Sequence, residues 1–107
     1  RNPQDPLLHY GLGLALAKLR QFDEALKELQ YVVRAFPRRE TFLLDLAQVY
    51  FEAGRYQKAL EILKPFCEKH PESTTACYLL ARTYQELGRY EEALPFFKSL
   101  EVRMANH

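Results

Sequence analysis

The triplet Gly54-Arg55-Tyr56 occurs again as Gly88-Arg89-Tyr90, 34 residues further along the chain. One period before the first copy, Arg20-Gln21-Phe22 is a weaker copy that keeps the aromatic residue. An Ala-Leu pair follows each copy at the same interval, at Ala25-Leu26, Ala59-Leu60 and Ala93-Leu94. Agreement over two full periods without a gap indicates three tandem units of one structural repeat.

Each unit has the pattern of two amphipathic helices. Asp5 and Pro6 form a helix start signal, because Asp caps the first turn and Pro needs no hydrogen bond at the first helical position. Apolar residues then recur at helical spacing, and Gly54 and Gly88 follow the later copies of this helix, where a left-handed residue ends a helix. No segment alternates with the period of two that strands need. The sequence therefore predicts an all-α chain with helices at about 6–19, 23–36, 41–53, 57–70, 75–87 and 91–104.

The spacing of small and large residues in each unit resembles that of the tetratricopeptide repeat, a 34-residue helix–turn–helix unit. The first helices read His9-x-x-Leu12-Gly13-x-x-Leu16, Leu43-x-x-Leu46-Ala47-x-x-Tyr50 and Cys77-x-x-Leu80-Ala81-x-x-Tyr84. The second helices read Ala25-x-x-x-Leu29, Ala59-x-x-x-Leu63 and Ala93-x-x-x-Phe97. The resemblance implies a right-handed α-solenoid of three antiparallel helix pairs at residues 6–39, 40–73 and 74–107, after a flank at residues 1–5.

The resemblance also implies that the first helix of each unit lines a concave inner face. Large apolar and aromatic groups at positions outside the repeat core would lie on this face beside polar groups. An exposed apolar patch with a polar rim is typical of a protein-binding surface, and a groove suits a helix or an extended peptide. The alternative is that some of these side chains complete the small core. The residues expected to bind a partner are Tyr10, Leu14, Leu44, Gln48, Phe51, Tyr78, Arg82 and Gln85.

The last helix carries more apolar side chains than one packed face requires. Terminal repeats need a polar outer face to stay soluble. Either the native chain continues with more repeats, or this surface pairs with another chain in a homo-oligomer. The residues expected on this end surface are Leu94, Phe96, Phe97 and Met104.

Composition and charge argue against several classes of function. The 15 Lys and Arg residues against 14 Asp and Glu give a net charge of +1, which lacks the basic excess of a nucleic-acid binder. The longest near-apolar run, residues 10–17, is far shorter than the roughly 20 residues that span a bilayer. His9, His70 and His107 are scattered, and no Cys or His spacing matches a metal site. We therefore expect no catalytic residue, no metal and no cofactor.

The two cysteines, Cys67 and Cys77, lie about equally far from the turn near Glu72, so they could face each other across adjacent helices. Packed helix axes are typically about 8–10 Å apart, whereas a disulfide requires Cα atoms about 5.5–6 Å apart. We therefore expect two buried thiols in preference to a bridge, which favours a reducing intracellular compartment.

Together these patterns predict a non-catalytic protein-interaction module that presents a groove to a peptide or a helix. Two alternatives stay open: a structural or oligomerisation segment of a longer solenoid, and an accessory domain of a larger enzyme. The expected partner is a protein or a peptide, and neither nucleic-acid binding nor membrane insertion is expected.

Overall fold

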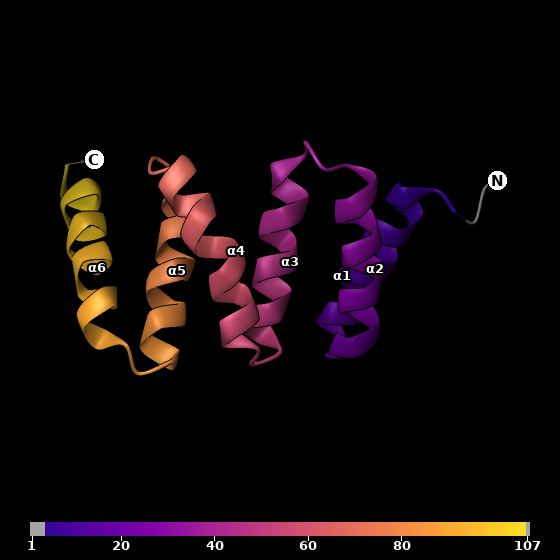
Figure 1. Ribbon diagram of the computed structural model, residues 1–107, viewed down its shortest axis with the longest axis horizontal. Helices are drawn as coiled ribbons and strands as arrows, with labels where there is room; N and C mark the ends of the chain where they lie inside the picture. Colours follow the sequence, from indigo (N-terminus) through magenta and orange to yellow (C-terminus); the bar gives the residue numbers. More distant parts are fainter. Residues whose placement is uncertain (1–3, 107) are drawn as a thin grey trace. The chain divides into compact units, whose positions relative to one another are not determined.

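The computed structural model describes residues 4–106, and within them the chain forms six α-helices and no strand (Figure 1). Each helix boundary lies within one residue of the boundary that the repeat pattern predicts, so the all-α fold is confirmed. His107 and the first three residues of the expected flank lie outside the described residues. The helices are α1 (Pro6–Lys18), α2 (Phe22–Ala35), α3 (Glu40–Glu52), α4 (Tyr56–Lys69), α5 (Thr74–Glu86) and α6 (Tyr90–Ala105).

The helix ends follow from local side-chain and backbone chemistry. Asp5 Oδ1 caps α1 by accepting a hydrogen bond from the Leu7 N–H at 3.0 Å. Gly54 and Gly88 have φ angles of 78° and 76°, so both adopt the left-handed conformation that ends a helix. In the first repeat Arg20 occupies this position with a φ of 62°, a conformation that costs a non-glycine residue about 1–2 kcal/mol.

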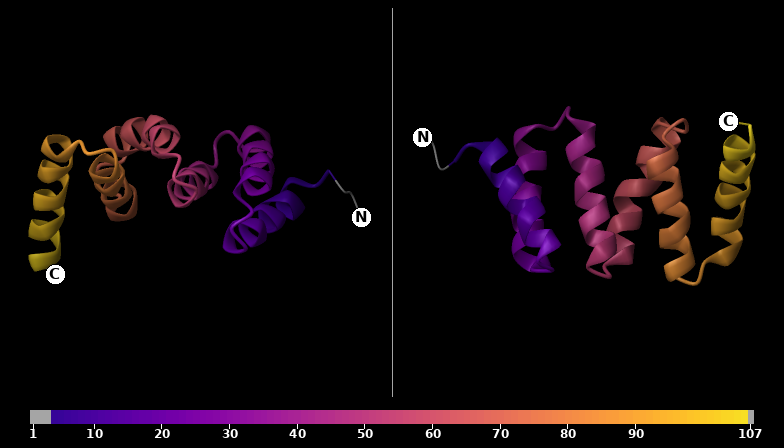
Figure 2. Two further views of the ribbon diagram at one scale, coloured as in Figure 1. Left: turned by 90° about the horizontal axis from the view of Figure 1, so that it is seen from below. Right: turned by 180° about the vertical axis from the view of Figure 1, so that it is seen from behind.

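The chain divides into two compact units, Arg1–Gly54 and Arg55–His107. In the first unit α2 packs against both α1 and α3, and in the second unit α5 packs against both α4 and α6. Short turns reverse the chain after each helix within a unit (Figure 2). The division falls inside the second of the three expected repeats, so the repeat boundaries stay a prediction.

Small residues allow paired helices to approach closely, as the repeat pattern predicts. Ala25 and Ala59 are completely buried, and a Cβ atom at Gly13 would lie 2.9 Å from Leu29 Cγ. Leu29 and Leu63 occupy the same repeat position in α2 and α4, and both side chains are fully buried. The core of each unit is therefore a layer of side chains between successive helices.

The two glycines of α1 have different surroundings, which gives a matched test of this close packing. Gly11→Ala should raise the free energy of unfolding by about 1 kcal/mol, because nothing lies within 4 Å of the added methyl group and Ala favours a helix. Gly13→Ala should lower it by about 1 kcal/mol, because the fully buried Leu29 has to move aside. Urea denaturation measures both changes, and equal effects would contradict the close approach of α1 and α2.

Cys67 and Cys77 form a disulfide, so the prediction of two thiols is wrong. Their Cα atoms are only 5.5 Å apart, because the short turn between α4 and α5 keeps the two helices close at this end. The typical separation of packed helix axes does not apply beside such a turn. Disulfides persist in oxidising environments, so the bridge removes the argument for a reducing compartment.

Candidate functional site

Four of the predicted binding residues of the first unit are half-buried on α1 and α3: Tyr10, Leu14, Leu44 and Gln48. The Tyr10 hydroxyl donates a hydrogen bond to Asp45 Oδ2 at 2.9 Å, and the Tyr10 ring centroid lies 4.7 Å from that of Phe42. Burial raises the pKa of the Tyr10 hydroxyl, and the hydrogen bond and the charge of Asp45 raise this pKa further. Tyr10 is therefore held in one orientation between α1 and α3.

Phe51, the fifth predicted residue of this unit, is buried. The expectation that it lies outside the core is wrong, because α3 buries residues on several of its sides, among them Phe42, Leu46 and Tyr50. Phe51 therefore contributes to packing and is not an accessible anchor for a partner.

In the second unit the predicted residues of α5 form a patch that we call the α5 patch: Tyr78, Arg82 and Gln85. Tyr78 is 48% exposed, and the centroid of its ring lies 5.7 Å from the guanidinium carbon of Arg82. A cation over an aromatic face is attracted by the electron density of the ring. The Tyr78 ring also meets Phe97 edge-on, with the centroids 6.2 Å apart. An exposed aromatic ring is thus positioned by two neighbours, with the exposed amide of Gln85 nearby on the same helix.

The end surface predicted on α6 separates into an exposed part and a packed part. Leu94 and Met104 are 52% and 70% exposed. Phe96 and Phe97 are half-buried, because their rings pack against Tyr84 and Tyr78 of α5. Of the four predicted residues, Leu94 and Met104 therefore offer the larger exposed surfaces.

Helix α1 exposes an apolar side chain, Leu12, that the sequence patterns did not assign to a surface. Leu12 is 46% exposed, whereas its repeat equivalents Leu46 and Leu80 are buried. Likewise Leu94 of α6 is exposed, whereas its equivalent Leu60 in α4 is buried. A comparison of equivalent positions, 34 residues apart, is the signal that identifies both faces.

His9 and His70, the histidines in the described part of the chain, each have a carboxylate neighbour. His9 Nδ1 contacts Glu28 Oε1, and His70 Nδ1 lies 3.3 Å from Glu72 Oε2. Among residues 4–106, no group of three or more His, Cys, Asp or Glu side chains is placed to hold a metal ion. No helix in this described part has the length and apolar character needed to cross a membrane.

Several solved structures are similar to this chain. MamA from AMB-1 is 26% identical with a TM-score of 0.84, over 98% of this chain and 62% of that chain. MamA from MSR-1 is 27% identical with a TM-score of 0.80, over 95% of this chain and 60% of that chain. The third is a kinesin light chain-type protein of Podosopora anserina that has nearly identical TPR-like repeats. It shares 25% sequence identity with this chain, with a TM-score of 0.81, over 98% of this chain and 57% of that chain. This chain thus spans about three fifths of the length of these relatives.

Comparison with families agrees with the repeat pattern, although no curated protein sequence matches the chain. Residues 1–40 match a model of the tetratricopeptide repeat. The repeats are of a kind that supports a protein-interaction scaffold, and the MamA structures share the TPR-like solenoid fold. Residues 21–100, most of the chain, match the model described as "Anaphase-promoting complex, cyclosome, subunit 3", and the chain belongs to that family of tetratricopeptide-repeat sequences.

Proposed function

We propose that the chain binds a peptide or a helix of a partner protein, and that it does so without catalysis. The binding surfaces are the exposed faces of α1, α3 and α5, the first helices of the three repeats. The α5 patch is the observation that carries this proposal, because Tyr78 is exposed and its ring lies against Arg82 and Phe97. Tyr and Arg are enriched among the residues that dominate binding energy at protein interfaces. A ring that is already oriented loses little conformational entropy when a partner contacts it.

The first unit offers a second patch on α1 and α3. Leu14 and Leu44 keep part of their apolar surface exposed there. Gln48 follows Leu44 by four residues on α3, and its Nε2 donates a hydrogen bond to Glu52 Oε2 at 3.1 Å. Apolar surface with polar groups at its edge suits an amphipathic helix or an extended peptide. We expect each patch to accept an apolar side chain of the partner.

Peptides selected from a random library on the folded chain test this function. Tyr78→Ala should weaken binding of a selected peptide at least about tenfold, because it removes the exposed anchor. Tyr90→Ala is the matched control, because Tyr90 is also exposed but lies on α6, and it should leave binding nearly unchanged. Isothermal titration calorimetry measures both affinities. Equal affinities of the two variants, or a library that yields no binder, would contradict the proposal.

Assembly of several copies through the exposed apolar side chains of α1 and α6 is the second candidate function. The exposure of Leu12 and Leu94, at positions that other repeats bury, favours it. Sedimentation velocity over a range of concentrations would then show association of the native chain. The double variant Leu94→Lys, Met104→Lys would abolish this association and leave peptide binding intact. A native chain that stays monomeric at every concentration excludes this second function.

A further inference from the structure

The second unit contains a cavity of about 390 Å³ lined by residues of α4, α5 and α6. Its volume lies in the range of small-molecule sites, about 300–1,000 Å³. Most of its wall is apolar, with the buried side chains of Leu80, Tyr84 and Leu100 beside the half-buried ring of Phe96. The Cys67–Cys77 disulfide forms part of the same wall and fixes α4 against α5.

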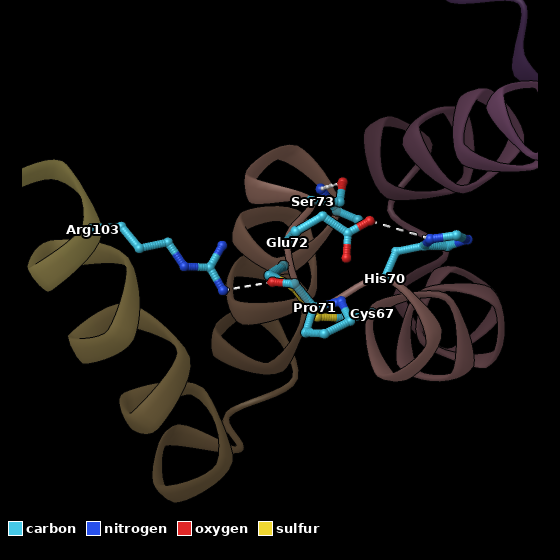
Figure 3. A network of polar contacts seen from close by, with 8 residues as sticks. Cys67, His70, Pro71, Glu72, Ser73 and Arg103 are labelled. Atoms are coloured by element: carbon cyan, nitrogen blue, oxygen red, sulfur yellow. Dashed lines mark hydrogen bonds and ion pairs between the residues drawn. A yellow bond between two sulfur atoms is a disulfide. The ribbon is translucent and has the colours of Figure 1, made fainter. Parts of the chain in front are cut away.

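Arg103 is the polar group that distinguishes this cavity from an ordinary gap between helices. Its Nη2 donates a hydrogen bond to the Pro71 carbonyl oxygen at 2.5 Å, across to the turn between α4 and α5 (Figure 3). Its Nη1 is buried and has no hydrogen-bond acceptor within the part of the chain that the structure describes. A buried donor without an acceptor is costly, and most for a charged group, so a turn of the Arg103 guanidinium that brings Nη1 to an acceptor in the cavity would be favourable.

The charges around the cavity favour an anion as that acceptor. Lys64 of α4 and Arg103 of α6 are the cations of the lining, and Glu68 is its one carboxylate. A guanidinium arm and a carboxylate form a short, charge-assisted hydrogen bond. The apolar part of the lining, which includes Leu80 and Phe96, offers packing surface to an apolar group. The lining therefore matches a molecule with one anionic end and an apolar body.

We propose that this cavity binds a small carboxylate with an aromatic or alkyl body. The Arg103 guanidinium turns so that Nη1 donates a hydrogen bond to the carboxylate, and the body packs against Leu80, Tyr84 and Phe96. A volume of 390 Å³ corresponds to about a dozen non-hydrogen atoms at about 30 Å³ for each water-sized group. The cavity lies apart from the α5 patch residues that we expect to contact a protein partner, since none of the three is in its lining.

Two probes that differ in one functional group test this site on the whole chain. 4-Phenylbutyrate carries the carboxylate, and 4-phenyl-1-butanol has the same body without a charge. In two-dimensional amide NMR titrations, 4-phenylbutyrate should shift the amide signals of Leu80, Tyr84 and Ser99 and reach saturation. The alcohol should bind at least about tenfold more weakly, because a hydrogen bond between two charged groups is lost.

Three variants separate the contribution of Arg103 from general attraction of anions. Arg103→Gln should reduce 4-phenylbutyrate affinity at least about tenfold and leave that of the alcohol unchanged. Lys98→Gln makes the same charge change at an exposed residue of α6 outside the lining, and should leave both affinities unchanged. Ser99→Leu fills the cavity from α6 and keeps Arg103, so it should abolish binding of both probes.

Several results would overturn the proposal. One is the absence of shifts at the lining amides up to the solubility limit of 4-phenylbutyrate. Another is equal affinity for the acid and the alcohol, which would show that Arg103 forms no hydrogen bond with the carboxylate. An equal loss of affinity in Lys98→Gln and Arg103→Gln would show non-specific attraction. If Arg103→Gln fails to fold, retained binding by Ser99→Leu would overturn the proposal just as directly.

Discussion

Leu63→Ala should lower the free energy of unfolding by about 3–4 kcal/mol, an effect as large as any that we expect from a single substitution in this chain. Leu63 has no exposed surface and lies in the middle of α4. The substitution loses the favourable free energy of burying the deleted carbons away from water. It also leaves a cavity that the surrounding helices fill only in part. In a chain of this length, the melting temperature should fall by about 12–16 °C.

Leu29→Ala in α2 makes the same change at the equivalent repeat position, and it should cost a similar amount because Leu29 is also fully buried. Phe97→Ala, at the third copy of this position, should cost less because Phe97 is half-buried. Glu61→Ala on the exposed side of α4 is the control, with an expected change within about 0.5 kcal/mol. Equal destabilisation by Leu63→Ala and Glu61→Ala in urea denaturation would contradict the repeat register.

Reduction of the Cys67–Cys77 disulfide should lower the free energy of unfolding by about 2.5–3 kcal/mol. The bridge joins residues ten positions apart in the sequence, and constraining a loop of this length in the unfolded chain accounts for that amount. Thermal unfolding followed by circular dichroism should show a melting temperature about 10 °C lower in the presence of a reductant.

The double variant Cys67→Ala, Cys77→Ala is the control for this effect. It lacks the bridge but keeps small apolar side chains at two buried positions. It should therefore melt close to the temperature of the reduced protein, with or without reductant. Identical melting of the native chain in oxidising and reducing buffer would show that the bridge contributes nothing to stability.

The repeat period was sufficient to predict the helices, and physical reasons explain why. Gly54 and Gly88 end helices through their own backbone conformation, and Asp5 starts one through its own side chain. Helical spacing assigns Gly13 and Leu29 each to the packed face of its own helix. Signals of this kind are local, so they can be recognised before the tertiary structure is known.

The features that the sequence did not predict depend on distances between helices. Periodicity assigns Phe51 to a face of α3, but its burial depends on what packs against that face. Cys67 and Cys77 lie at similar distances on either side of a turn. Whether they form a bridge depends on the distance between their Cα atoms, which the packing of α4 against α5 sets. The cavity beside Arg103 depends on its contact with Pro71, 32 positions away in the sequence. No pattern within one helix contains this information.

The footprint of a selected peptide is the most direct test of recognition through the first helices. Amide NMR of the whole chain with a saturating peptide should shift the signals of α5, with the largest changes at Tyr78, Arg82 and Gln85. The signals of Leu94 and Met104 on α6 should stay in place. A footprint confined to α6, or to the residues that line the cavity of the second unit, would contradict recognition through the first helices.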